Sequence, residues 1–225
     1  MTNYPLCLPL QLKTRTKVLQ TIDCHPSYSF YEVWLGTITD LDDAFVSHLA
    51  SLIGPKLIVL FRTKNMEITL PLQQRLYFLQ QLSDTSSLID LDVVAQQEEL
   101  KFAKQEKLTL QKIISYHDYH RTPSDEKLDG LVKEILTHQP EIVKLAALCK
   151  SPSDGVRLLA LGIKLRELGR RAVVVGMGPH GLVTRTFGTL WGNALAFAPF
   201  EKSAESAPGQ LTEGELRALL ASLER

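Results

Sequence analysis

The sequence predicts a protein of the α/β class, a (β/α)8 TIM barrel that takes up residues 1–225 as a single domain. Three observations predict this fold. About eight short apolar runs recur along the chain, with turn or charge signals between them. Several of these runs are apolar almost throughout, which is typical of strands buried on both faces of a parallel sheet. Most of the stretches between the runs have helical spacing. An open doubly wound sheet is the alternative, and the number of repeats favours the closed barrel.

The apolar runs are the predicted strands. Leu57-Ile-Val-Leu-Phe61 and Ala172-Val-Val-Val175 show the continuous pattern most clearly. In chain order, the predicted strands are residues 6–10, 29–35, 56–62, 88–94, 112–117, 141–148, 171–176 and 195–200.

The helices are placed by their start and stop signals. Residues 41–53 follow Asp40 and end at Gly54-Pro55, and a Thr-Pro-Ser-Asp-Glu segment opens the helix at residues 123–137. The predicted helices are residues 41–53, 71–82, 95–107, 123–137, 153–168 and 212–223. Residues 182–193 are the least clear segment. A Pro/Ser/Gly-rich stretch at 203–210 follows the eighth strand, where a barrel places a loop that faces the substrate.

Composition excludes several classes of protein. The chain has 225 residues, with 25 Lys and Arg against 25 Asp and Glu, so it lacks the basic excess that broad nucleic-acid binding needs. No apolar run reaches the length of about 18–20 residues that spans a membrane, and the first residues do not resemble a signal peptide. Cys7, Cys24 and Cys149 form no CxxC pair, which argues against a zinc site or a disulfide framework. We therefore expect a reduced, cytoplasmic compartment.

In a barrel, the functional residues lie at the carboxyl ends of the strands. Polar or flexible residues end or follow most of the predicted strands, and they form the candidate set: Glu32, Arg62, Asp90, Asp92, His117, Lys144 and Met177-Gly178.

Lys144 is the most informative of these residues, because it interrupts the apolar segment Glu141-Ile-Val-Lys-Leu-Ala-Ala-Leu148. A buried lysine is costly unless it is neutral, paired or used covalently. Burial and nearby cations lower a lysine pKa, which frees the amine to attack a carbonyl and form a Schiff base. A strand-end lysine that reaches solvent is the alternative.

His117 follows the neighbouring apolar run, a position that suits a general acid and base near neutral pH. A structural histidine is the alternative, and His117 with His120 lacks a convincing third metal ligand. Arg62 and Arg185 suit a carboxylate clamp or a surface ion pair. Asp90 and Asp92 point the same way on a strand. They could bind substrate hydroxyls, orient His117 or balance the cations, or they could be a charge pair at a strand end.

Four blocks of the sequence together resemble type I 3-dehydroquinate dehydratase, the Schiff-base enzyme of the shikimate pathway. The resemblance extends from about Leu6 to the end of the chain. It is carried by Ser115-Tyr-His-Asp-Tyr-His-Arg-Thr-Pro-Ser124, Glu141-Ile-Val-Lys-Leu-Ala146, Gly176-Met-Gly with Thr184-Arg185, and Ser206-Ala-Pro-Gly-Gln210. It implies a (β/α)8 barrel that dehydrates 3-dehydroquinate to 3-dehydroshikimate on the route to chorismate and the aromatic amino acids. No metal and no organic cofactor are implied.

The resemblance also implies a role for each site residue. Lys144 would form the imine, and His117 would remove the C2 proton and help the C1 hydroxyl leave. Arg185, Ser206 and Gln210 would hold the substrate carboxylate. Met177 and Phe197 would line the pocket. The ring hydroxyls would be bound, or the charged side of the site organised, by Glu32, Arg62, Asp90 and Asp92.

Three features depart from the family pattern. The second strand reads Glu32-Val33-Trp34, where the family usually has Glu-x-Arg. The loop at residues 63–67 is short, and Glu67 is the candidate there for a carboxylate that orients His117. Asp92 stands where family members often have Glu. None of these departures touches Lys144 or His117, so we expect activity.

Two other functions remain as alternatives. A class I aldolase would also use a barrel lysine, but it would need a phosphate site after the seventh and eighth strands. A catalytically weak binding domain is suggested by Trp34. The expected partner is the small-molecule substrate 3-dehydroquinate, without nucleic acid or membrane. A homodimer and a fusion to shikimate dehydrogenase both stay open. The chain has no dinucleotide fingerprint, and we expect either a stand-alone enzyme or an excised domain.

Overall fold

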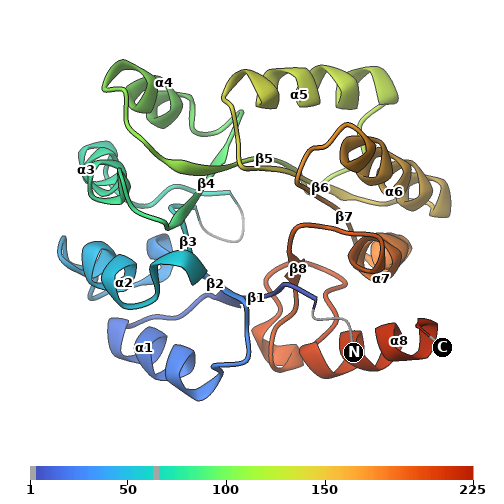
Figure 1. Ribbon diagram of the computed structural model, residues 1–225, viewed down its shortest axis with the longest axis horizontal. Coiled ribbons are helices and arrows are strands. Elements are labelled where there is room, and N and C mark those ends of the chain that lie inside the picture. Colours follow the sequence, from blue (N-terminus) through green and yellow to red (C-terminus); the bar gives the residue numbers. More distant parts are fainter. Residues whose placement is uncertain (1–3, 63–65, 225) are drawn as a thin grey trace.

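The chain folds into a barrel of parallel strands surrounded by helices (Figure 1). The computed structural model describes residues 4–62 and 66–224. Within these residues, eight strands lie in the order β7-β6-β5-β4-β3-β2-β1-β8, and every pair of neighbouring strands in this order is parallel. The helices ring the strands in chain order. This arrangement confirms the (β/α)8 barrel and excludes the open doubly wound sheet.

The elements alternate strictly along the described chain. The strands are β1 (Leu6–Leu10), β2 (Phe30–Trp34), β3 (Leu57–Leu60), β4 (Leu88–Asp92), β5 (Gln111–Asp118), β6 (Ile142–Leu148), β7 (Ala172–Met177) and β8 (Ala196–Phe197). The helices are α1 (Arg15–Cys24), α2 (Phe45–Ile53), α3 (Leu72–Leu82), α4 (Gln97–Gln105), α5 (Asp125–Thr137), α6 (Pro152–Glu167), α7 (Leu182–Leu190) and α8 (Glu213–Leu223). Short 3-10 helices are η1 (Leu35–Thr37), η2 (Gly54–Lys56), η3 (Pro179–Gly181) and η4 (Lys202–Ala204).

The last strand is shorter than the sequence predicts. We expected residues 195–200, whereas β8 has only two residues. The N–H groups of Ala196 and Ala198 donate to the carbonyls of Pro5 and Cys7, after which the segment leaves β1. Beside this short strand, the backbone N–H of Ala194 donates to the Ala172 carbonyl at 2.7 Å. The Asn193 side chain accepts from the Val174 N–H at 3.3 Å, so a side chain replaces part of the ladder at the junction of β7 and β8.

Two helices were not clear from the sequence. Helix α1 begins after Thr14, whose side chain accepts a hydrogen bond from the backbone N–H of Lys17. It buries only Val18 and Ile22, spaced four apart, so its apolar stripe is narrow. Helix α7 falls within residues 182–193, and its buried residues are three threonines, Arg185 and Gly188 rather than an aliphatic stripe.

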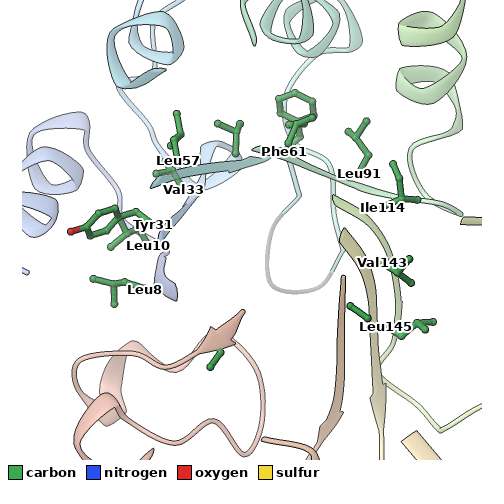
Figure 2. Close-up of a cluster of buried hydrophobic side chains, with 14 of the residues drawn as sticks. Leu8, Leu10, Tyr31, Val33, Leu57, Phe61, Leu91, Ile114, Val143 and Leu145 are labelled. Carbon is green, nitrogen blue, oxygen red and sulfur yellow. The ribbon is translucent and has the colours of Figure 1, made fainter. Parts of the chain in front are cut away.

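The core has two layers, because successive side chains of a strand point to opposite faces. The outer layer packs between the strands and the helices. Figure 2 shows Leu8, Phe61, Leu91 and Val143 among the side chains that point outward from the strands. The inner layer closes the amino-terminal end of the barrel, with Cys7, Ile58, Leu88, Ile113, Ile142, Val173 and Leu195 among its members. Polar inward-facing residues then lie nearer the carboxyl ends of the strands.

Two further findings concern the cysteines and the helices. Cys7 and Cys149 are buried and Cys24 is exposed, all three as free thiols.

No helix in the described ranges is long and apolar enough to cross a membrane.

Candidate active site

A cavity lies at the carboxyl ends of the strands, where a barrel places its small-molecule sites. The predicted site residues line it, except for Glu67, Asp90, Asp92 and Gly178, and of these Asp90 and Asp92 bond directly to lining residues. The lining comprises Glu32, Trp34, Leu60, Arg62, His117, Tyr119, Lys144, Ala146, Val175, Met177, Arg185, Phe197, Ser206, Ala207 and Gln210.

Strand periodicity explains how the charged residues converge. On β6, Ile142, Lys144 and Ala146 alternate with outward-facing residues, so the lysine faces the barrel interior. On β5, Ser115 pairs with Lys144 in register, and His117 follows two residues later on the same face. The parallel arrangement therefore brings an amine and an imidazole from neighbouring strands to one cavity.

Lys144 is 6% exposed and contacts two carboxylates. Its Nζ donates to Glu32 Oε1 at 2.9 Å and to Asp90 Oδ2 at 2.7 Å. The ammonium also lies 4.3 Å from the centre of the Phe197 ring, a distance at which a cation is attracted to an aromatic face. The residue is therefore a paired, buried lysine rather than one that reaches solvent.

The pKa of Lys144 differs from the sequence-based expectation. Burial favours the neutral amine and lowers the pKa, as does Arg62, but the carboxylates of Asp90 and Glu32 outweigh both and raise it above its ordinary value. The sequence could not show that two carboxylates on other strands would point at this amine. In this structure the lysine is held as an ammonium, and it must lose a proton before it can act as a nucleophile.

His117 lies next to Asp92. The distance between His117 Nδ1 and Asp92 Oδ2 is 3.0 Å, and the two side chains are 8% and 2% exposed. Asp92 Oδ1 accepts hydrogen bonds from the backbone N–H groups of Val94 and Ala95, which fixes the carboxylate after β4. The carboxylate therefore holds one ring nitrogen and leaves the other available to the cavity.

Burial lowers the pKa of His117 below its ordinary value, and the nearby Arg62 lowers it further against the opposing hydrogen bond to Asp92. The imidazole is thus neutral near pH 7 and able to accept a proton. Glu67, the other candidate partner of this histidine, is exposed. Residues 63–65 of the same loop lie outside the described residues.

Arg62 is occupied by protein acceptors. It donates to Asp90 Oδ1 at 2.7 Å, to the Asp90 carbonyl and Gln96 Oε1 at 3.2 Å each, and to Ser115 Oγ at 3.2 Å. Burial raises the pKa of Asp90, but Arg62 and Lys144 together hold it well below its ordinary value. Asp90 therefore stays ionised and bridges the two cations.

Arg185, on α7, is the cation with fewer partners. It is 7% exposed, and its Nε has no hydrogen-bond partner among the described residues. Its Nη2 makes one long hydrogen bond, 3.4 Å, to the Pro208 carbonyl. Burial lowers the pKa of Arg185 to about 10, so it remains charged at neutral pH. A buried guanidinium with free donors is suited to bind an anionic group.

The loop after β8 folds over the cavity beside Arg185. Gln210 Oε1 accepts from the Ser206 N–H at 2.7 Å, and Gln210 Nε2 donates to Ser206 Oγ at 2.9 Å. Gly209 has a φ of +78°, and a Cβ at this position would lie 2.8 Å from the Gly178 carbonyl oxygen. Glycine therefore allows this loop to pack directly on the loop that follows β7.

Three polar residues that the sequence did not single out also belong to the site. Ser115 Oγ donates to Asp90 Oδ1 at 2.5 Å, and Gln96 bonds both Arg62 and the Asp92 N–H. Tyr119 lines the cavity, with its ring 6.4 Å from that of His117. Strand alternation from His117 would have found Ser115 and Tyr119, because both lie two residues away on the same face.

In the described part of the chain, no group of three or more His, Cys, Asp or Glu side chains is placed to hold a metal ion. The apolar wall of the cavity includes Met177, at 1% exposure, and Phe197, at 9%. Trp34 belongs to the same wall and donates from its indole Nε1 to Glu32 Oε2 at 2.8 Å.

Comparison with known proteins gives consistent similarities. Residues 6–225 match the family model described as Type I 3-dehydroquinase. A 3-dehydroquinate dehydratase of Methanosarcina acetivorans is 30% identical over 147 residues, which cover 64% of this chain and 60% of the relative. The matched region thus spans less than two thirds of the length of that curated relative.

Solved structures share the fold. The crystal structure of 3-dehydroquinate dehydratase from Geobacillus kaustophilus superposes with a TM-score of 0.81 at 23% identity, covering 98% of this chain and 91% of that one. A dehydroquinate dehydratase and shikimate dehydrogenase structure from S. pombe has a TM-score of 0.78 at 18% identity, covering 100% of this chain and 46% of that one.

Proposed function

This chain belongs to the type I 3-dehydroquinase family, and from that premise we propose that it converts 3-dehydroquinate to 3-dehydroshikimate and water through a Schiff base. The observation that carries the proposal is the pairing of a buried lysine with a neutral histidine at one cavity. The reaction is a step of the shikimate pathway, which leads to chorismate and the aromatic amino acids.

The first half of the proposed mechanism forms the imine. Lys144 loses a proton, and its lone pair attacks the ring ketone at C3 to give a carbinolamine, which expels water to form an iminium. The carboxylates of Glu32 and Asp90 hold the nitrogen on the inner side of the cavity before attack. No cofactor is needed in this scheme, because the protonated imine withdraws electrons from the neighbouring carbon.

The second half eliminates water. His117 takes the C2 proton, and the C–H electron pair moves toward the iminium to form an enamine. The enamine then expels the C1 hydroxyl, which receives the proton from the His117 imidazolium and leaves as water. Proton removal and return by one imidazole predict a syn elimination. Hydrolysis of the product imine restores Lys144.

The substrate carboxylate is proposed to bind near α7. Arg185 offers an uncommitted buried Nε, and the Ser206 and Gln210 side chains lie in the adjoining loop. Ring hydroxyls would face Glu32 and Arg62 on the opposite side of the lining. Asp90 and Asp92 would act from beneath, by holding Lys144, Arg62 and His117 in place.

Borohydride trapping tests the function directly. The protein is incubated with 3-dehydroquinate, reduced with sodium borohydride and analysed by intact mass and peptide mapping. We expect an adduct on Lys144, and rising 3-dehydroshikimate absorbance in the unreduced enzyme. Lys144→Ala should give neither, His117→Ala should give the adduct with little product, and Lys112→Ala is the matched control, because that lysine lies near the start of β5, at the opposite end of the barrel.

The outcomes separate the alternative functions. Adduct without product from the unmodified chain would support a catalytically weak binding domain. Absence of both would contradict the dehydratase, and an adduct with a phosphorylated ketose instead would support an aldolase. We also propose a cytoplasmic location and a single-domain organisation, with neither nucleic acid nor membrane as a partner. Light scattering of the purified protein would decide whether it forms a homodimer.

A further inference from the structure

Trp34 occupies an unusual position for a tryptophan. It ends β2, is 6% exposed, and lines the cavity beside the charged groups. Its indole Nε1 donates to Glu32 Oε2 at 2.8 Å, in the interior of the barrel. An indole has a single donor and no acceptor, so this hydrogen bond uses its whole polar capacity. Trp34 therefore acts on the site through Glu32.

The two oxygens of Glu32 serve different partners. Oε2 accepts from Trp34, while Oε1 accepts from Lys144 at 2.9 Å. The other carboxylate on the lysine, Asp90, is bound instead by the Arg62 guanidinium and the Ser115 hydroxyl. Each carboxylate thus has one oxygen on the lysine and the other on further donors, which include a guanidinium for Asp90 but only the neutral indole for Glu32.

We propose that Trp34 is a positioning residue for imine formation: its indole N–H occupies one oxygen of Glu32, so that only the other oxygen holds the Lys144 amine. This inference rests on the proposed function, because it concerns the lysine that forms the imine. Without the indole donor, Glu32 could turn both oxygens toward the ammonium and hold it more tightly. The amine would then lose its proton less readily before it attacks the carbonyl.

The surroundings of Lys144 contain the other groups that set this balance. They come from several elements that face the amine or line the same cavity: Cys7 on β1, Glu32 on β2, Arg62 after β3, Asp90 on β4, His117 on β5, Arg185 on α7 and the Phe197 ring on β8. A substitution at Trp34 leaves all of these groups in the chain. The effect of a Trp34 substitution on the pH dependence of imine formation therefore reports how strongly Glu32 binds the Lys144 ammonium.

Two substitutions should move the pH dependence in opposite directions. Trp34→Phe keeps an aromatic ring but removes the donor, so Glu32 holds the ammonium more tightly. Trp34→Arg keeps a donor and adds a positive charge, which opposes the ammonium. A hydrogen bond to a charged group corresponds to about one to two pH units. We therefore expect the midpoint for imine formation to rise by about one unit in the first variant and to fall in the second.

The experiment measures imine formation alone. The full-length chain and its variants are mixed with saturating 3-dehydroquinate from pH 6 to pH 10, a range below the midpoint because the carboxylates raise the Lys144 pKa above its ordinary value. The mixtures are quenched with borohydride at millisecond times, and the rate of adduct formation is obtained from the adduct mass. Trp191→Phe is the matched control, because Trp191 is the other of the two tryptophans and is 40% exposed after α7. Below the midpoint, Trp34→Phe should form the adduct about tenfold more slowly, and Trp191→Phe should match the unmodified chain.

The possible results are distinguishable. Equal rates of adduct formation in all proteins across this pH range, or rate changes of both Trp34 variants in the same direction, would overturn the inference while leaving the dehydratase intact. Absence of adduct in the unmodified chain would instead contradict the proposed function.

A second measurement does not depend on the folding of either Trp34 variant. The indole N–H signals of the unmodified chain can be recorded by ¹H–¹⁵N NMR and assigned with Trp191→Phe. The Trp34 signal should exchange slowly with solvent, because its N–H is buried and bonded to Glu32. A rapidly exchanging signal would contradict the hydrogen bond and the inference.

Discussion

Replacement of Asp92 by asparagine tests how His117 acts as a base. The substitution keeps the shape of the side chain and one oxygen that can accept from the N–H groups of Val94 and Ala95. It removes the negative charge 3.0 Å from His117 Nδ1. Because both side chains are buried, solvent screens this pair only weakly.

The magnitude follows from the geometry. At 3.0 Å and an effective dielectric constant of about 20, a full charge pair interacts by about 5 kcal/mol, which is an upper bound. A hydrogen bond to a charged group contributes about 1.5–3 kcal/mol net. Taking about 2–3 kcal/mol as the lost stabilisation of the imidazolium, kcat should fall by about 30- to 160-fold.

The direction of the pH effect is also determined. Burial and Arg62 lower the pKa of His117, and the hydrogen bond to Asp92 opposes them. The Asp92→Asn substitution would remove that opposition, so the pKa of His117 should fall further and the acidic limb of the kcat profile should move to lower pH. Imine formation should be nearly unaffected, because Asp92 makes no hydrogen bond to Lys144 among the described contacts.

The assay combines steady-state kinetics with borohydride trapping. Asp92→Asn should accumulate the trapped adduct while product formation slows. Asp118→Asn is the matched control, because Asp118 accepts in the same way from the N–H groups of His120 and Arg121, at 2.9 and 3.0 Å. A kcat for Asp92→Asn within threefold of the control, or equal loss of adduct and product, would refute the assigned role.

Three other predictions concern stability and binding. Gly181→Ala would press a Cβ against the backbone of Gly176 in β7, so the free energy of unfolding in urea should fall by about 1–3 kcal/mol. Gly130→Ala places a Cβ in open space on α5, so the same free energy should rise by about 0.5–1 kcal/mol. The unfolding free energy should decrease as the pH falls below about 6.5, because burial lowers the pKa of His117 in the folded state, so that the unfolded chain binds the proton first. It should decrease again below about 4, because the folded state lowers the pKa of Asp92, so that the unfolded chain again binds the proton first. Arg185→Lys should raise KM about tenfold or more while the adduct still forms at saturation.

Strand positions were largely predictable from the sequence because apolar runs mark them directly. All eight predicted strands correspond to observed ones, and β1 agrees at both ends. Helix α1 was missed because its buried face is only Val18 and Ile22, too narrow to stand out from its polar neighbours. The shortening of β8 depends on tertiary contacts at its edge.

The site was predictable as a set of residues but not as a network. Alternation along single strands indicates which residues face inward, and it places Lys144 and His117 at one end of the barrel. It does not indicate which carboxylate meets which cation, because that depends on the stagger between strands. The sequence therefore left several roles open for Asp92, and it misjudged the direction of the Lys144 pKa.

The charge pairing in the cavity also determines how a substrate can be oriented. Of the cations that line the cavity in the described chain, Arg62 is bound by Asp90, and Lys144 is bound by Asp90 and Glu32. Arg185 instead donates to a neutral carbonyl, that of Pro208, and its Nε has no partner among the described residues. An anionic group is repelled from the side that holds Glu32 and attracted to Arg185, so we infer that a substrate carboxylate binds at α7. A ring anchored there would extend across the cavity, with its far side toward Lys144 and an intermediate carbon toward His117, as the proposed mechanism requires.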